Sequence, residues 1–127
     1  MGVSVLCRGA IGLDRAVTET NGKRVCFLQC DIVKDPITYG NIDTVLLLDV
    51  LEHVPREDER GLLNKINNYN KYLIINIPDQ QDDKQPYDRK VNPLSIINYL
   101  SRKNRLHRYQ RFAISKEESY NFMVFTK

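Results

Sequence analysis

The chain has 127 residues, of which 42% are hydrophobic and 28% are charged, and its formal net charge is +3 at pH 7. These values support one modest hydrophobic core, so we expect a single domain over residues 1–127. No apolar run approaches the roughly 18 to 20 residues that a membrane span needs, and the first residues do not read as a signal peptide. Composition thus argues against a membrane protein, and we expect a cytoplasmic one. The mild positive charge permits an anionic partner without indicating one.

The N-terminal segment allows two interpretations. In the first, residues 3–7 form a strand and residues 8–12 form a turn. In the second, residues 3–8 are the end of a helix, and Ala10 to Leu13 form a strand that ends at Asp14. We prefer the second interpretation because Asp14 then repeats a pattern found twice further along the chain, an apolar run stopped by an acid.

Two later apolar runs end in aspartate. Val25 to Cys30 is followed by Asp31, and Val45 to Leu48 is followed by Asp49. The second run is continuous, which is typical of a strand covered on both faces. Strands of this kind with short polar links predict a parallel sheet whose carboxyl edge is lined by acids. In open α/β sheets, ligands bind in the crevice outside that edge.

A helix and a further strand are predicted next. Residues 56–69 place Leu62, Leu63, Ile66 and Tyr69 at helical spacing, and acids occupy the first turn, where the helix dipole favours negative charge. Residues 72–77 then form a buried apolar strand that Pro78 closes.

The last third of the chain predicts a loop, a helix and a hairpin. Residues 79–91 are polar and irregular, as in a substrate-binding lid or a solvated connection. Asn92 and Pro93 are typical of a helix cap and first position, with Leu94, Ile97 and Leu100 on one face. Residues 105–114 and 120–126 form two strands around a polar turn, an antiparallel hairpin.

The hairpin carries the basic residues of interest. Strict alternation places Arg105, His107, Tyr109 and Arg111 on one face of the first hairpin strand, with Arg108 next to them. Such a face suits nucleic acid, with an aromatic ring among phosphate-binding cations. A charged edge strand that avoids aggregation explains the same pattern.

With these segments in view, the sequence from Ala10 onward resembles the class I S-adenosylmethionine-dependent methyltransferases, especially the O-methyltransferases of ubiquinone biosynthesis. The segments that carry the resemblance are AIGLD at 10–14, VCFLQCDI at 25–32, IDTVLLLDVLEHVP at 42–55, YLIINIP at 72–78 and YNFMVF at 120–125. The resemblance implies an α/β fold with a Rossmann-like, mostly parallel sheet and an antiparallel C-terminal hairpin.

The resemblance also implies a cofactor and its ligands. S-adenosylmethionine would lie across the carboxyl edge, with Asp14 accepting hydrogen bonds from the ribose hydroxyls. Asp31 would accept from the adenine amino group, and Ile32 would flank the ring. Asp49 and Val50 would line the methionine end, largely through backbone atoms. The implied reaction transfers a methyl group to an acceptor that the sequence does not identify.

The chain departs from the family at its N-terminus, because the glycine-rich first loop is missing. Gly2 would be the last glycine of that loop, so the first strand would be absent and the fold incomplete there. A sheet without that strand leaves edges that usually find a partner, so we expect a homodimer. The alternative function is a catalytically inactive binding or assembly module that keeps the fold.

Each candidate residue also has a structural interpretation. Asp14 and Asp31 would be acids that start turns. His53 is a candidate general base, since its titration range suits proton transfer, or it braces the turn into the helix. The spacing of Asp49, Glu52 and His53, with the distant His107, also suggests metal ligands, but His107 falls on the late edge strand and we expect no metal site.

Overall fold

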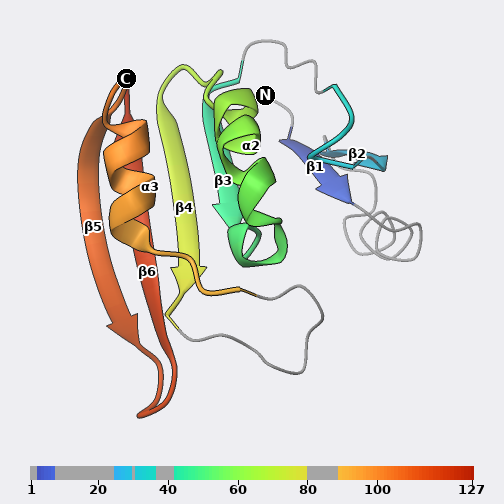
Figure 1. Cartoon of the computed structure of the whole chain (residues 1–127). Coiled ribbons are helices and arrows are strands. Elements are labelled where there is room, and N and C mark those ends of the chain that lie inside the picture. The colour runs from blue at the N-terminus through green and yellow to red at the C-terminus, as the bar shows by residue number, and fades with distance from the viewer. Residues whose placement is uncertain (1–2, 8–24, 30, 37–41, 80–88) are drawn as a thin grey trace. The chain divides into compact units, whose positions relative to one another are not determined.

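The computed structural model describes residues 3–7, 25–29, 31–36, 42–79 and 89–127 (Figure 1). The chain forms two compact units, Met1–Thr38 and Tyr39–Lys127, which we describe separately.

The N-terminal unit contains two parallel strands. Strand β1 (Val3–Cys7) pairs with β2 (Val25–Gln29), and the register runs from Val3 opposite Val25 to Cys7 opposite Gln29. Our preferred interpretation, in which residues 3–8 end a helix, is therefore wrong. The β-branched Val3 and Val5 favour an extended strand, and a second run with similar residues pairs with it. The predicted strand at residues 10–13 and Asp14 lie outside the described residues.

The C-terminal unit is built on a four-stranded sheet with the order β3-β4-β6-β5. Strand β3 (Thr44–Leu48) is parallel to β4 (Tyr72–Pro78). Strand β6 (Ser119–Thr126) is antiparallel to β4 and to β5 (Arg105–Ala113). Parallel pairs followed by an antiparallel C-terminal hairpin are the predicted α/β arrangement, so the fold class is confirmed.

In the described residues of this unit, two α-helices and two short 3-10 helices accompany the sheet. The predicted helix over residues 56–69 is shorter, with η2 (Arg56–Asp58) leading into α2 (Glu59–Ile66). Helix α3 (Pro93–Leu100) starts as predicted, because the Asn92 side chain accepts a hydrogen bond of 3.0 Å from the Leu94 N–H. Within the described ranges, no helix is long and apolar enough to cross a membrane.

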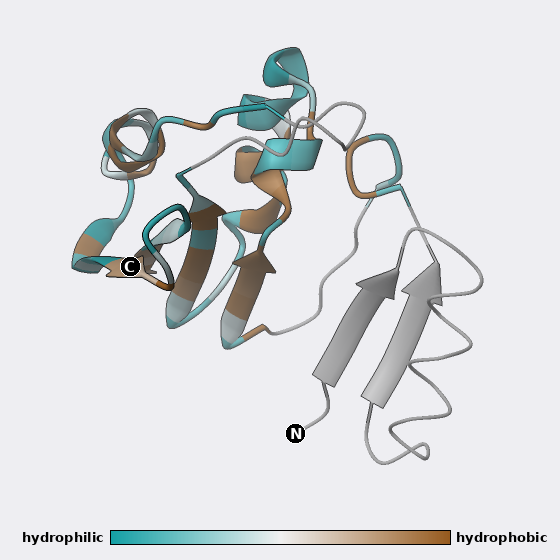
Figure 2. Cartoon of the chain, turned by 90° about the horizontal axis from the view of Figure 1, so that it is seen from below, coloured by the Kyte–Doolittle hydropathy of each residue, from teal (hydrophilic) through white to brown (hydrophobic). Residues whose placement is uncertain are grey.

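The hydrophobic core lies between the sheet and the two α-helices, which cover the same face of it (Figures 1 and 2). Alternate residues of β4 and β6 point into this core, as a half-covered sheet requires. The fully buried side chains include Leu73, Ile75 and Ile77 of β4, Met123 and Phe125 of β6, Leu62, Leu63 and Ile66 of α2, and Ile96 of α3. Tyr69 is also buried, as its helical spacing predicts, although it follows the helix.

The prediction that β3 is covered on both faces is wrong for the C-terminal unit. Leu47 is 3% exposed, but Leu46 is 60% and Leu48 is 50% exposed. Leu47 pairs with the buried Ile75 and therefore lies on the face that the helices cover. The side chains of Leu46 and Leu48 point to the opposite face, and β3 is the edge strand of this sheet.

The predicted apolar face of α3 also needs a correction. Leu100 is buried as expected, but Leu94 is 64% exposed and Ile96 is completely buried in its place. The helix therefore presents a different stripe to the sheet, and the side chain of Leu94, in the first turn, lies at the surface.

Candidate functional site

The candidate site lies where β3 and β4 end, and Asp49 is its first residue. Asp49 has a φ of 53°, in the left-handed region that few residues other than glycine adopt. Its N–H donates to the Asn76 carbonyl (3.2 Å), and its Oδ1 accepts from Asn76 Nδ2 (3.0 Å). These two bonds join the ends of the parallel strands. They hold an exposed carboxylate at the carboxyl edge of the sheet, where the sequence predicts it.

The segment after Val50 is a tight 3-10 turn, η1 (Leu51–His53). Leu51, Glu52 and Val54 are all buried, whereas the side chain of His53 is 43% exposed. His53 Nε2 lies 3.6 Å from Glu52 Oε1, so the imidazole is next to a buried carboxylate. The ring contacts the turn and also reaches solvent, so both roles of His53 stay predictions.

Arg89 fixes this turn from a distant part of the chain. Its N–H donates to the Glu52 carbonyl (3.0 Å) and its Nε to the Val54 carbonyl (2.6 Å). Its Nη2 forms an ion pair of 2.7 Å with Glu59 Oε1 on α2, and both side chains are largely buried. Sequence reasoning missed Arg89, because nothing in the polar run before it distinguishes this arginine from a solvated one.

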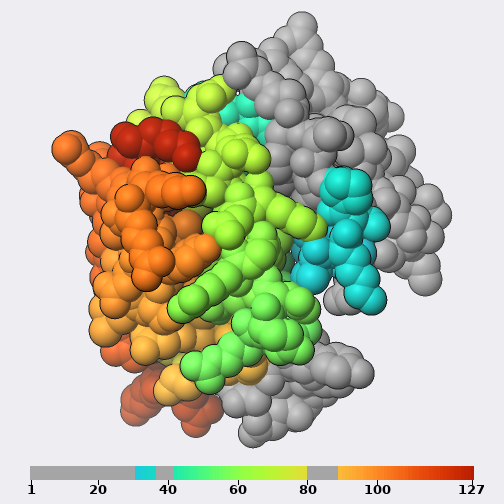
Figure 3. Space-filling view, turned by 45° about the horizontal axis from the view of Figure 1, so that its top comes forward, coloured from blue at the N-terminus to red at the C-terminus, as the bar shows by residue number. Residues whose placement is uncertain are grey.

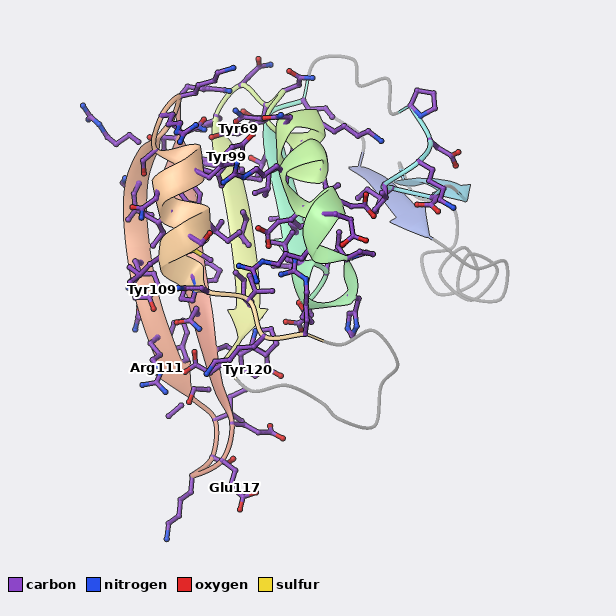
Figure 4. All side chains as sticks on the ribbon, in the orientation of Figure 1. Tyr69, Tyr99, Tyr109, Arg111, Glu117 and Tyr120 are labelled. Atoms are coloured by element: carbon purple, nitrogen blue, oxygen red, sulfur yellow. The ribbon has the colours of Figure 1, made fainter. Side chains whose placement is uncertain are left out.

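Tyr120 places a neutral phenol at the same edge, opposite Pro78 in the register of β4 and β6 (Figure 4). Burial raises the pKa of Tyr120, and the negative charges of Asp49, Glu118 and Glu52 raise it further. The hydroxyl therefore keeps its proton at neutral pH and can donate a hydrogen bond. Sequence reasoning treated this tyrosine only as part of a strand.

Asp79 connects the end of β4 to the hairpin. Its carboxylate accepts hydrogen bonds from Asn121 Nδ2 and Arg111 Nε, and Tyr109 donates to the Oδ1 of Asn121. Asn121 is 1% exposed, so this network satisfies a buried amide. The buried polar residue in an otherwise apolar strand is a sequence signal that could have indicated the network.

Of the residues predicted to bind the nucleoside, Asp31 and Ile32 are described and Asp14 is not. Asp31 Oδ1 accepts hydrogen bonds from the N–H groups of Val33 (2.9 Å) and Lys34 (3.3 Å). Its own N–H donates to Asp35 Oδ2 (2.7 Å). Asp31 therefore builds the turn after β2, as the structural interpretation expects, while the ligand roles of Asp14, Asp31 and Ile32 stay predictions.

The basic residues of β5 do not share the predicted face. A register shift lies between Leu106 and Arg108, so strict alternation fails there. Arg105 and Arg108 pair with Thr126 and Val124, on one face of β6. Tyr109 and Arg111 pair with Met123 and Asn121, on the other face. The prediction of one shared face is wrong, because a bulge inverts the alternation at His107.

The sequence suggests Asp49, Glu52 and His53 with His107 as metal ligands but predicts no metal site. Among the residues that the structure describes, no group of three or more His, Cys, Asp or Glu side chains could hold a metal ion. The first three belong to the turn after β3, and His107 lies on β5, the strand furthest from it in the sheet.

Comparison with known proteins finds matches among solved structures only. No protein-family model matches the sequence, and no curated protein matches it. The N-methyltransferase NodS from Bradyrhizobium japonicum WM9, in complex with S-adenosyl-L-homocysteine, matches with a TM-score of 0.79 at 11% identity. Magnesium protoporphyrin IX methyltransferase (ChlM) from Synechocystis PCC 6803, with bound S-adenosyl-L-homocysteine, matches with a TM-score of 0.79 at 15% identity.

These matches extend over 99% of this chain but over 66% of NodS and 64% of ChlM, so the chain spans about two thirds of their length. The [4+2]-cyclase SpnF also matches, with a TM-score of 0.74 at 7% identity over 100% of this chain and 66% of its own. The chain has the class I S-adenosylmethionine-dependent methyltransferase fold. The resemblance to the ubiquinone-biosynthesis enzymes in particular stays a prediction.

Proposed function

We propose that this chain binds S-adenosylmethionine and transfers its methyl group to an acceptor. The observation that carries the proposal is the end of β3, where a left-handed backbone and two bonds to Asn76 hold the Asp49 carboxylate at the sheet edge. The methionine end of the cofactor carries an ammonium group, a sulfonium centre and a carboxylate, so its net charge is positive. An exposed carboxylate suits that cationic end, so the residues present fit the cofactor.

The residue roles follow the resemblance. Asp49 and Val50 would line the methionine end, whereas Asp14, Asp31 and Ile32 would bind the nucleoside. The bound cofactor supplies an electrophilic methyl group, and the protein mainly contributes the alignment of donor and acceptor. His53 would accept a proton from an acceptor hydroxyl or amine, since its ring reaches solvent beside the Glu52 carboxylate.

Calorimetric titration with S-adenosyl-L-homocysteine tests the cofactor. The informative variant is Asp31→Asn, because an amide oxygen can keep the hydrogen bonds from Val33 and Lys34 that build the turn. It removes the carboxylate that would accept from adenine, so we expect binding about tenfold weaker than in the unchanged protein. Asp43→Asn is the matched control, with the same change of charge at an exposed position.

The outcomes separate the proposals. Absence of binding at millimolar ligand would contradict cofactor binding and favour the inactive binding or assembly module. Equal affinities of the Asp31 and Asp43 variants would leave cofactor binding intact and remove the nucleoside role of Asp31.

Self-association is a second proposal and rests on a separate observation. In the C-terminal unit, β3 is an edge strand that presents the exposed Leu46 and Leu48 side chains. Exposed edges and apolar surface favour association, and this supports a homodimer. A nucleic-acid partner at Arg105, His107, Arg108 and Arg111 also stays a proposal, with Arg105 and Arg108 on one face of β5 and Arg111 on the other.

A further inference from the structure

A polar groove of about 310 Å³ runs along the outer side of α3, next to α2. The two helices lie side by side at the surface of the C-terminal unit (Figure 3). The side chains that matter here are Arg60 of α2, Ser95, Asn98 and Tyr99 of α3, and Arg102, which follows α3. Every polar side chain in this group can donate a hydrogen bond, and among the described residues that line the groove none is acidic.

Tyr99 contacts both arginines of the groove. Its hydroxyl donates a hydrogen bond of 2.7 Å to Asn64 Oδ1, one helical turn after Arg60, and this bond holds the ring between the helices (Figure 4). The guanidinium carbon of Arg60 lies 5.4 Å from the ring centroid, and that of Arg102 lies 5.7 Å from it. Both distances are within the range of a cation–π interaction. One aromatic ring therefore holds two cations at the wall of the groove.

These two cations differ from Arg89 and Arg111 of the same unit. Arg89 forms an ion pair with Glu59, and Arg111 forms one with Asp79. Arg60 and Arg102 form no ion pair with any residue in the described ranges. Two like charges beside one ring repel each other, and an anion bound at the groove wall would offset that repulsion.

We propose that this groove binds a phosphate group. A guanidinium stacked on an aromatic ring keeps its N–H donors in its own plane, where they can form charge-assisted hydrogen bonds with oxyanions. A phosphate has enough oxygens to engage both guanidiniums together with the Ser95 hydroxyl or the Asn98 amide. A carboxylate, with two oxygens, would leave part of this donor set unused.

The phosphate can come from two sources, a free phosphate ion or the phosphodiester backbone of a nucleic-acid strand. Both present the same tetrahedral anion to the arginines. The two titrations below distinguish them, and neither contains S-adenosyl-L-homocysteine, so the result is independent of the proposed methyl transfer.

Inorganic phosphate and a single-stranded oligodeoxynucleotide are titrated separately into the full chain, and binding is followed by calorimetry. The test variant is Arg60→Gln with Arg102→Gln. The matched control is Arg56→Gln with Lys116→Gln, which removes two exposed positive charges outside the groove. We expect the test variant to weaken binding by about tenfold and the control to change it by less than about twofold.

The salt dependence gives a second readout that a folding defect would not reproduce. If the oligonucleotide binds, the slope of log K against log salt should become shallower by about 0.7 in the test variant, because both arginines engage the same phosphate and one phosphate contact to a single strand is lost. Binding of phosphate alone identifies the free ion as the source, and binding of the oligonucleotide alone identifies the strand. Absence of binding in both titrations, or equal losses in test and control variants, would overturn the proposal.

Discussion

The backbone conformation of Asp49 positions the carboxylate of the candidate site. A left-handed φ is unfavourable for residues with a Cβ, although short polar side chains such as Asp and Asn tolerate it best. The fold holds Asp49 there with its two bonds to Asn76. The Asp49 carboxylate thereby gains a fixed direction at the end of β3, and local strain is a common feature of functional sites.

Two substitutions of Asp49 separate its charge from its conformation. Asp49→Asn keeps an Oδ1 acceptor for Asn76 and a residue that tolerates positive φ, so its free energy of unfolding should stay within about 0.5 kcal/mol. Asp49→Val loses the hydrogen bond and places a β-branched side chain in the left-handed region, so we expect a loss of about 2 kcal/mol. Urea unfolding measures both, and equal stability of the two variants would contradict this account.

At the residue scale, the sequence predicts Asp49 but not the residue that fixes it. An acid after a continuous apolar run shows where a buried strand stops. Asn76 contacts Asp49 only because of the strand register. Arg89 contacts Val54 only because the chain returns to this turn after residue 88. Neither contact follows from local spacing. The turn at Asp31 was foreseeable, because aspartate accepts hydrogen bonds from the next N–H groups in the chain.

Among the elements, the β5–β6 hairpin is fastened to the end of β4 by Asp79. Burial acts to raise the pKa of Asp79, but hydrogen bonds from Asn121 and Arg111, with the charges of Arg111 and Lys90, outweigh it and lower the pKa below 3.8. The ionised carboxylate is therefore bound better in the folded state than in the unfolded state. Because of this difference, the stabilisation that Asp79 gives to the hairpin depends on pH.

The stabilisation from Asp79 should be fully present above the pKa of the unfolded state and disappear as the pH falls through the lower pKa of the folded state. Asp79→Asn should lower the free energy of unfolding by about 1 kcal/mol at neutral pH, and the difference from the unchanged protein should shrink below about pH 4. Glu117→Gln, at the exposed hairpin turn, is the control. Chemical unfolding across acidic pH measures the effect, and a constant difference would contradict it.

The elements themselves were largely predictable, and the errors have identifiable physical causes. Hydrophobic patterning located α2, α3 and the strands of the C-terminal unit, and it was clearest where one apolar face is buried, as in α2, β4 and β6. It failed at His107, where one extra residue in β5 inverts the alternation. It also failed at Leu46 and Leu48, because a continuous apolar run predicts strand burial but does not show which neighbours cover each face.

At the scale of the whole molecule, the proposed homodimer concerns the surface around β3. Leu46 and Leu48 point to the face of the sheet opposite the helices, at its edge strand. Replacing both with lysine adds charge to this surface and should prevent association without disturbing the core. Ile114→Lys, at a residue 65% exposed after β5, is the control.

Sedimentation equilibrium provides the measurement. The unchanged protein and the Ile114 variant should sediment as dimers, and the variant with both leucines replaced should sediment as a monomer. A monomer for the unchanged protein at high concentration would exclude the homodimer.

The segment between Asp79 and Arg89 can change in length at little cost in stability. Both flanking residues are anchored, Asp79 by Asn121 and Arg111, and Arg89 by Glu52, Val54 and Glu59. Residues inserted between two fixed points add little closure entropy, about 0.6 kcal/mol for each doubling of length. Evolution or engineering could therefore lengthen this segment while both attachment points remain in place.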